Sequence, residues 1–295
     1  MKIGIVGYQG SGKSTLFEWL TGVASDPAVA HQGQSAMAPV PEDRIAPLCE
    51  VYHPKKITMA ALELVDTPGL SRTHEGSAAR LGLIREAEAI VLVAPAFGGS
   101  DPIAELNSFQ EDTLLADLEI VSGRVERLRD SVKRPRPNRD QEIAELATLE
   151  QVQTALESGK PMAAANMTDE QLKATRSFRL MSEKPKLVLI NAADDDEDLG
   201  RYGTAAPDGT PLIAARVGLE RELEKMSAED RAAFEAEMGL SGSHKDAVLR
   251  MILEVSGQML YFTAGEKEVR TWMLRKGGSA LEAAANIHTD LARGF

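Results

Sequence analysis

A run of eight residues near the N-terminus has the composition of a phosphate-binding loop. Residues 7–14, GYQGSGKS, match the pattern G-x-x-x-x-G-K-[ST], with an apolar segment before them and an amphipathic one after them. Glycines reach positive φ, so the backbone N–H groups can close around phosphate oxygens. We expect Lys13 to neutralise the β- and γ-phosphates and Ser14 to ligate Mg²⁺. The expected nucleotide-binding residues here are Gly7, Gly10, Ser11, Gly12, Lys13, Ser14 and Thr15.

A second phosphate contact is expected at residues 61–70, ALELVDTPGL, which read as a buried strand ending at Asp66. An aspartate at this strand end holds Mg²⁺ in nucleotide triphosphatases, directly or through water. The Gly69 N–H can meet the γ-phosphate, which gives Gly69 and Lys13 the catalytic roles. Leu70 stands where many such enzymes carry a water-orienting glutamine, and a leucine cannot form that hydrogen bond.

The base would be read after a third apolar strand, at Asn191-Ala192-Ala193-Asp194. The guanine signature N-K-x-D is half present, because alanine replaces its lysine. The Asp194 carboxylate can accept guanine N–H groups or the adenine amino group, or it can simply belong to a solvated acidic loop. The backbone of Ala214 and Ala215, after the next strand, is expected to touch the base.

The order of the elements predicts an α/β fold, a doubly wound sheet with its ligand at the carboxyl ends of the strands. Helical segments, the first at about 14–20, alternate with the strands. The expected strands lie near 2–7, 57–65, 89–94, 186–191 and 211–214. We assign 1–111 and 181–258 to the nucleotide-binding domain, 112–180 to a helical insertion, and 259–295 to a C-terminal unit.

The insertion is predicted to be an antiparallel coiled-coil hairpin, because two apolar seams flank the break RPRPN at 134–138. The seam residues are Leu114, Leu118, Val121, Val125, Leu128 and Val132, then Ile143, Leu146, Leu149, Val152 and Leu156. Basic residues gather around the tip: Arg124, Arg127, Arg129, Lys133, Arg134, Arg136 and Arg139, against Glu126, Asp130 and Asp140. This excess indicates either a solvated helix surface or a contact for RNA or an acidic partner.

The last part of the chain is expected to form helices near 218–226, 228–238 and 244–258, strands at about 259–263 and 268–274, and a helix from Ser279. The second helix begins with a capping-box-like Ser227-Ala228-Glu229-Asp230. We place His288 inside the final helix, in a structural role.

The chain has 295 residues, a net charge of −12 and a pI of about 5.0, so non-specific coating of DNA or RNA is not expected. Cys49 is the single cysteine, which excludes an intrachain disulfide. The chain opens directly on MKIGIVG, without a signal peptide, and its longest apolar run, 89–97, is about half of the ~20 residues of a membrane span. We expect a cytoplasmic protein that contacts neither membrane nor DNA.

These pieces resemble the YchF/Obg-like ATPases, a branch of the translation-factor-related (TRAFAC) P-loop GTPases, over nearly the whole chain. The matching segments are GSGKSTLF, DTPGL, LESGKP, KPKLVLIN, SAEDRAAFEAEMGL, YFTAGEKEVRTWMLRKG and IHTDLARGF. The resemblance implies a TGS-like β-grasp unit in 259–295, a preference for ATP, ribosome association and a link to translation and stress. Family members also replace the water-orienting glutamine by a hydrophobic residue, as at Leu70.

The sequence departs from this family in the parts that act on the γ-phosphate. The family loop usually reads N-V-G-K-S, and its switch segment is replaced by the shorter residues 30–44, which offer no threonine for Mg²⁺; Ser35 is the nearest hydroxyl by spacing. The histidine proposed to assist hydrolysis is absent, with His31 and His74 as unsupported substitutes. Asp194 stands in place of the family's glutamate. The two strands and helix at the end would by themselves leave an open sheet edge, an incomplete TGS-like unit. We expect that either the sequence is a fragment or this end packs on the rest of the chain or on a partner.

We therefore expect an Mg²⁺-dependent hydrolase of ATP or GTP, slow and ribosome-associated. The alternative is a nucleotide-gated binding module with little intrinsic hydrolysis, whose hairpin docks on ribosomal RNA or protein. A phosphotransferase for small molecules fits GSGKS but not the aspartate motifs.

Overall fold

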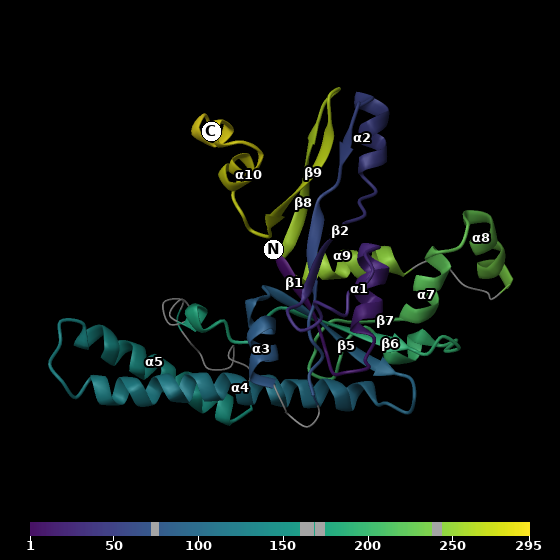
Figure 1. The fold of residues 1–295 in the computed structure, drawn as a ribbon. Coiled ribbons are helices and arrows are strands. Elements are labelled where there is room, and N and C mark those ends of the chain that lie inside the picture. Colours follow the sequence, from purple (N-terminus) through teal and green to yellow (C-terminus); the bar gives the residue numbers. More distant parts are fainter. Residues whose placement is uncertain (72–76, 160–167, 169–174, 238–243) are drawn as a thin grey trace.

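The structure is a computed structural model that describes residues 1–71, 77–159, 168, 175–237 and 244–295 (Figure 1). Its main sheet has six strands in the order β2-β4-β1-β5-β6-β7. All neighbours are parallel except β2, which runs antiparallel to β4 at the edge. This confirms the predicted α/β doubly wound class. The strands are β1 (Lys2–Val6), β2 (Gln34–Pro39), β4 (Ala61–Asp66), β5 (Ala89–Ala96), β6 (Lys186–Ala192) and β7 (Leu212–Ala215).

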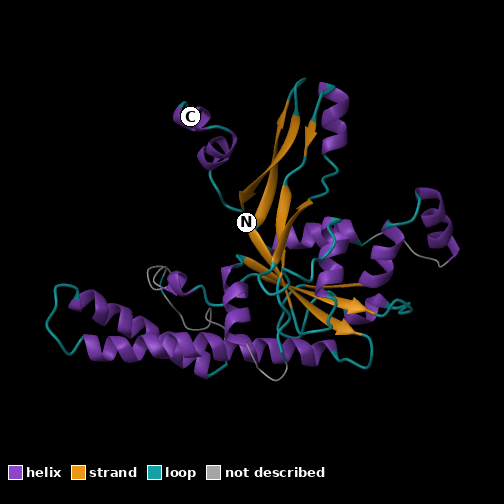
Figure 2. Cartoon of the chain, in the orientation of Figure 1, coloured by secondary structure: helices purple, strands orange, loops and turns teal. Residues whose placement is uncertain are grey.

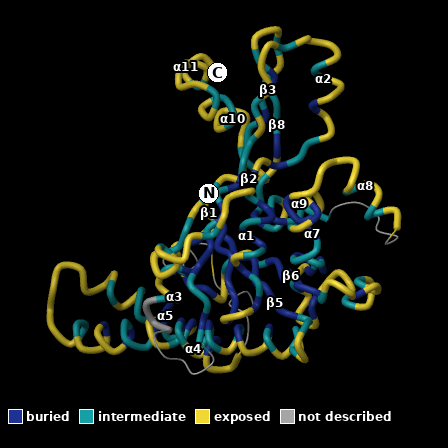
Figure 3. Tube along the Cα trace, turned by 45° about the vertical axis from the view of Figure 1, so that its right-hand side comes forward, coloured by how far each residue is buried: buried dark blue, intermediate teal, exposed yellow. Residues whose placement is uncertain are grey.

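Helices cover both faces of this sheet because side chains alternate along each strand. Val91 and Val93 of β5 pack with α1 (Lys13–Thr21), α7 (Val217–Glu224) and α9 (Lys245–Val255) on one face. Ile90 and Leu92 of the same strand pack with α3 (Ser77–Glu86) and α4 (Pro102–Ser131) on the other. The buried residues accordingly gather around the central sheet (Figure 3).

The predicted helical hairpin is present and projects from the main domain along the α4 axis (Figure 1). The helix α4 pairs with α5 (Arg139–Glu157) over the expected seam. Two seam assignments were wrong: Val132 follows the end of α4, and Ile143 is 42% exposed. The buried hairpin core is Val121, Val125, Leu128, Leu149, Val152, Leu156 and Leu180.

The helix α4 begins at Pro102, ten residues before the predicted start of the insertion. Asp101 caps it by accepting hydrogen bonds from two backbone N–H groups of the first turn. Leu106 and Phe109, in its first third, are buried in the core of the main domain. One continuous helix therefore belongs both to the nucleotide-binding domain and to the hairpin.

The C-terminal strands β8 (Gln258–Ala264) and β9 (Val269–Arg275) form a second sheet with β3 (Ile57–Thr58), in the order β3-β9-β8. This corrects one expectation. The predicted strand 57–65 is split between two sheets, and the Ala60 N–H between its two parts donates to the Thr271 hydroxyl. Of the alternatives for the end of the chain, β9 follows packing on the rest of the chain, because it pairs in parallel with β3. The unpredicted helix α2 (Ile45–Tyr52) lies beside this sheet (Figure 2).

The remaining helices are α8 (Ala228–Glu237), α10 (Ala280–Ile287) and α11 (Thr289–Arg293), with 3₁₀ turns at Arg176–Phe178 and Leu199–Tyr202. Ser227 caps α8 through the Asp230 N–H, as predicted. The prediction of one continuous helix at the C-terminus was wrong. His288 has an extended backbone, with φ −165° and ψ 140°, and separates α10 from α11. Its Nδ1 accepts the Asp290 N–H. In the described parts of the chain, no helix has the length and apolar character needed to cross a bilayer.

Candidate nucleotide site

The phosphate loop joins β1 to α1 and has the backbone that its glycines predict. Gly7, Gly10 and Gly12 have φ of 146°, 81° and 94°, a region that side chains disfavour. A Cβ on Gly12 would lie 2.1 Å from the Asn191 Nδ2 atom, and one on Gly7 would lie 2.7 Å from the Val93 carbonyl oxygen. Two of the three glycines are therefore required by space as well as by φ.

Lys13 is the first residue of α1, and its side chain is almost completely buried. Its Nζ donates a 2.7 Å hydrogen bond to the carbonyl oxygen of Tyr8. Burial lowers the pKa of the Lys13 ammonium to about 8, although the nearby Asp66 carboxylate opposes this shift. The cation is thus held against the loop, in an environment where phosphate oxygens would stabilise its charge.

A hydroxyl and a carboxylate meet beside Lys13. The Ser14 Oγ donates to Asp66 Oδ2 at 2.7 Å, which joins the start of α1 to the end of β4. Asp66 is 8% exposed, and its Oδ1 atom is buried without a hydrogen-bond partner. A buried, unsatisfied carboxylate oxygen is costly unless a cation or water meets it. This oxygen-ligand pair therefore fits the predicted Mg²⁺, which takes few protein ligands and completes its shell with phosphate and water.

Ser25 is a residue of this cluster that sequence reasoning missed. Its Oγ donates to the same Asp66 Oδ2 atom at 3.2 Å. Ser25 follows α1 and belongs to no nucleotide motif, so only its place in the fold identifies it.

The weak expectation that Ser35 ligates Mg²⁺ was wrong. Ser35 pairs with Val65 in the β2–β4 ladder, and paired residues share a face of the sheet. Asp66, the next residue along β4, points to the opposite face. Ser35 instead lines a small cavity with Thr67 and Glu86. Spacing along the chain alone could not show that the Ser35 hydroxyl lies on the other face of the sheet from Asp66.

The loop carrying Gly69 lies directly on the phosphate loop. Leu70 N–H donates to the Gly7 carbonyl at 3.0 Å, and Gln9 N–H donates to the Leu70 carbonyl at 3.1 Å. A Cβ built on Gly69 would lie 3.0 Å from Lys13 Nζ, which places the predicted γ-phosphate sensor beside the predicted cation. Arg80 of α3, which the sequence did not single out, donates to the Gly69 carbonyl at 2.8 Å.

The predicted base-reading residues have protein partners of their own. The Asn191 Nδ2 donates to the Ser11 carbonyl at 3.0 Å, so Asn191 holds the phosphate loop. Asp194 Oδ1 accepts the Leu219 N–H at 2.9 Å, in the first turn of α7. Ala215 pairs with Asn191, and Ala214 with Ile190, in the β6–β7 ladder. The fold thus brings all four candidates to the carboxyl ends of adjacent strands.

The last predicted residue of the phosphate loop, Thr15, is half-buried and lies in the first turn of α1.

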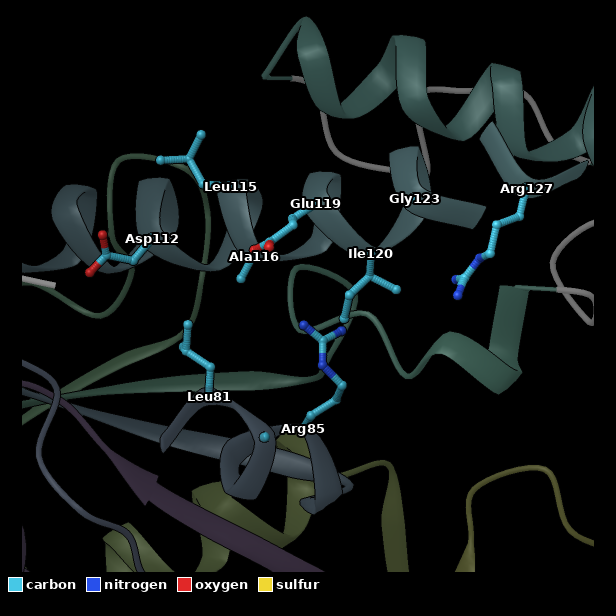
Figure 4. A pocket seen from close by; sticks show the side chains of 10 residues that line it. Leu81, Arg85, Asp112, Leu115, Ala116, Glu119, Ile120, Gly123 and Arg127 are labelled. Carbon is cyan, nitrogen blue, oxygen red and sulfur yellow. The ribbon is translucent and has the colours of Figure 1, made fainter. Parts of the chain in front are cut away.

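The phosphate loop is also bonded to the hairpin helix. The Tyr8 hydroxyl donates to Asp112 of α4 at 2.7 Å. Asp112 lies at one end of an approximately 800 Å³ groove between α3 and α4, with Arg127 at the other (Figure 4). Within this groove Arg85 of α3 forms a 2.8 Å ion pair with the fully buried Asp117. Helix α4 is therefore tied to both the phosphate loop and the helix that follows the Gly69 loop.

The tip of the hairpin has fewer unpaired positive charges than its sequence indicates. Arg124 pairs with Glu145 and Arg129 with Glu150, both from α5, and Lys133 pairs with Asp130. Within this basic tip, Arg127, Arg134, Arg136 and Arg139 form no ion pair with any described residue. Charge counting along one helix could not include the partners supplied by the other.

The proposed substitute histidines gain no support. His31 is exposed, and its ring contacts the Gln32 amide. His74 lies outside the described residues. Among the described residues no group of three or more His, Cys, Asp or Glu side chains gathers as a metal site, so Ser14 and Asp66 remain the metal candidates.

Comparison with known proteins places this geometry in one family. A family model described as "50S ribosome-binding GTPase" matches residues 2–121, and the YchF GTPase C-terminal model, described as "Protein of unknown function (DUF933)", matches 259–295. The chain is 31% identical to the ribosome-binding ATPase YchF of Bacillus subtilis, over 99% of this chain and 86% of that protein. It is 30% identical to Obg-like ATPase 1 of Oryza sativa subsp. indica, over 100% and 80%.

A solved structure has the same fold over the whole chain. The structure of the Schizosaccharomyces pombe YchF GTPase superposes with a TM-score of 0.83 and 28% identity, and covers 100% of this chain and 86% of that one. With these sequence and structural matches, the chain belongs to the YchF family of P-loop nucleotide triphosphatases.

Proposed function

We propose that this chain is an Mg²⁺-dependent hydrolase that cleaves the β–γ bond of ATP or GTP with water as the nucleophile. The observation that supports it best is the meeting of Lys13, Ser14 and Asp66 next to Gly69, from three separate segments of the chain. Relatives that carry the name ribosome-binding ATPase agree with this chemistry.

The side chains divide the work by charge. Lys13 and the loop N–H groups would neutralise charge on the β- and γ-phosphates, and the Gly69 N–H would contact the γ-phosphate. Ser14 and Asp66 would hold the magnesium ion, which supplies charge neutralisation between the phosphates. At the base end, Asp194 and the backbone of Ala214 and Ala215 would border the base. Positioning and electrostatics, not a side-chain nucleophile, would determine the rate.

Hydrolysis should be slow, because the residue after Gly69 cannot help it. Leu70 is 2% exposed and packs in the apolar core with Tyr8 and Ile84. Its side chain neither forms hydrogen bonds nor reaches the phosphate site. The water must be oriented from another part of the site.

A steady-state assay of phosphate release tests the hydrolysis. Lys13→Met keeps the buried stem but removes the charge, and we expect the rate to fall by roughly 100-fold or more. The matched control is Lys267→Met, at an exposed lysine on the turn between β8 and β9. Equal rates for the parent and Lys13→Met would refute the proposal. Omission of Mg²⁺ should reduce the parent to the rate of Lys13→Met.

We propose further that the chain acts on ribosomes in the cytoplasm, through the tip of the hairpin. Arg134, Arg136 and Arg139 surround the turn between α4 and α5, and Arg134 and Arg136 are exposed and form no ion pair with described residues. Clustered arginines recognise phosphate groups of RNA. Charge reversal of Arg134 and Arg136 should reduce cosedimentation with ribosomes, whereas the same reversal at Lys55 and Lys56, near β3, should not. Equal losses would point to net charge alone.

The second candidate, a nucleotide-gated binding module, is favoured by one observation. Tyr8 of the phosphate loop is hydrogen-bonded to Asp112 of α4, so the loop and the hairpin share a rigid connection. In this case ribosome cosedimentation would depend on the nucleotide, and a non-hydrolysable analogue would support it as well as ATP or GTP. Binding that is the same with and without nucleotide would refute the gating.

A further inference from the structure

We propose that Gln9, within the phosphate loop, orients the attacking water in the reaction and so fills the role that Leu70 cannot. This inference rests on the proposed hydrolysis. It assigns a catalytic residue inside the G-x-x-x-x-G-K-[ST] pattern, at a position that the pattern leaves undefined.

The location of Gln9 is the first argument. A point 3.0 Å from Lys13 Nζ, where a Cβ on Gly69 would lie, is also 3.1 Å from the Gln9 Cα and Cγ atoms. The Gln9 side chain, the Lys13 ammonium and Gly69 therefore pack closely against one another. They meet between the cation and the loop proposed to contact the γ-phosphate, next to the place where the attacking water must be held.

The backbone holds Gln9 in place while leaving its side chain available. Its N–H donates to the Leu70 carbonyl at 3.1 Å, and the adjacent residues Tyr8 and Leu70 form a parallel bridge. The residue is exposed, and no described residue hydrogen-bonds to its carboxamide. A fixed base with an uncommitted amide is the arrangement expected of a residue that engages a ligand.

The chemistry of nearby side chains excludes them from this role. Orienting water requires an acceptor for a water proton, and a donor for a phosphate oxygen is an advantage; a carboxamide has both. Lys13 and Arg80 are donors only. Thr67 is 4% exposed, and its hydroxyl already donates to the Ile5 carbonyl at 2.7 Å. Gln9, in contrast, combines a donor and an acceptor, and its side chain is exposed next to Lys13 and Gly69.

The proposed step is an in-line displacement. The water oxygen forms a bond to the γ-phosphorus as the bond from phosphorus to the β–γ bridging oxygen breaks, and that electron pair stays on the nucleoside diphosphate. The water proton passes to the phosphate product. Gln9 accepts a hydrogen bond from the water and is unchanged at the end, so no further reactant is needed.

Gln9→Ala tests the assignment. We expect kcat to fall roughly 100-fold, the typical cost of a misplaced reactant, with affinity for a non-hydrolysable triphosphate analogue within twofold of the parent. Gln9→Asn, which keeps the amide on a shorter stem, should retain an intermediate rate. Binding of the nucleoside diphosphate with aluminium fluoride, which mimics the transferred phosphoryl group, should weaken in Gln9→Ala. Gln141→Ala, at an exposed glutamine of α5, is the matched control.

Two failures are distinguishable in this assay. If the parent releases phosphate no faster than Lys13→Met, the proposed hydrolysis is wrong and the role of Gln9 falls with it. If the parent exceeds Lys13→Met but Gln9→Ala matches the parent, hydrolysis stands and only the inference about Gln9 is overturned. A parallel loss of analogue affinity and rate in Gln9→Ala would likewise overturn it, because that loss would indicate a binding role.

Discussion

The two ends of the nucleotide site differ in whether their motif residues are hydrogen-bonded to other parts of the protein or left available for a ligand. At the phosphate end, three segments converge on one place, and Asp66 keeps an unsatisfied oxygen. At the base end, Asn191 donates to the Ser11 carbonyl and Asp194 accepts the Leu219 N–H. The first end is arranged around a ligand, whereas the second is partly occupied in holding the fold together.

This difference shows that residues that match a motif in sequence need not have the role that the motif implies. Asn191 and Asp194 stand at the positions of the guanine signature, yet the bond of Asn191 acts on the phosphate loop. The base end can therefore lose its lysine, as at Ala192, and still keep the asparagine for a structural reason. The comparison predicts that substitutions of residues that form or hold the phosphate loop, Asn191 included, affect the affinity for all nucleotides alike, whereas a substitution at Asp194 changes selectivity between them.

Gly12→Ala should have the largest effect. Its Cβ would lie 2.1 Å from Asn191 Nδ2 at a φ of 94°, and backbone strain of this kind alone costs about 1–3 kcal/mol. We expect affinity for ATP and GTP, measured by calorimetry, to fall by more than about 100-fold. Gly10→Ala is the matched control, because its φ is 81° but no atom lies within 4 Å of its Cβ. Equal losses in both variants would show that the contact with Asn191 does not matter.

Asn191→Ala should have the next largest effect. It leaves the buried Ser11 carbonyl without its partner, a loss of about 1–2 kcal/mol, or roughly 5- to 30-fold in affinity. The affinities for ATP and GTP should fall by the same factor, because the hydrogen bond from Asn191 to the Ser11 carbonyl holds the phosphate loop. Competition binding of the two nucleotides measures this directly. A change in their ratio would mean that Asn191 reads the base after all.

Local patterns were sufficient to predict the parts of the fold that depend on neighbouring residues. A short motif predicts the phosphate loop. Apolar residues at regular spacing predict the strands around it and most of the hairpin seam. The meeting of Ser14 and Asp66 could be expected, because both residues lie at the carboxyl ends of neighbouring strands, β1 and β4.

The missed features depend on residues far apart in the sequence. The strand at 57–65 is split because Val269 and Thr271, some two hundred residues later, pair with its first half. Ser25 reaches Asp66 only through the path of the chain after α1, and Ser35 fails because alternation in β2 directs it to the other face. Arg124 keeps its charge but forms an ion pair with Glu145 of the opposite helix. None of these is visible in a window of ten or twenty residues.

The pH dependence of nucleotide affinity tests the charge at the phosphate end. Burial lowers the pKa of Lys13 to about 8, and bound phosphate favours its charged form. Affinity should be constant below pH 7 and fall above pH 8, by up to about tenfold per pH unit, because binding must then take up a proton. Titrations from pH 6.5 to 9.5 measure this. Lys13→Met should lack the slope; the same slope in that variant would assign it to another group.

Asp194→Asn should have the smallest effect, and it is the one that probes the base end alone. The asparagine oxygen can still accept the Leu219 N–H, so the fold is preserved, but the second acceptor oxygen and the negative charge are lost. Guanine offers two N–H groups to a carboxylate, and adenine offers only its amino group. We expect the affinity for GTP to fall by about fivefold, which corresponds to the ~1 kcal/mol of an ordinary hydrogen bond, and the affinity for ATP to stay within twofold. If both nucleotides are unchanged, Asp194 serves α7 alone, and the base end has no reader among the residues of the signature.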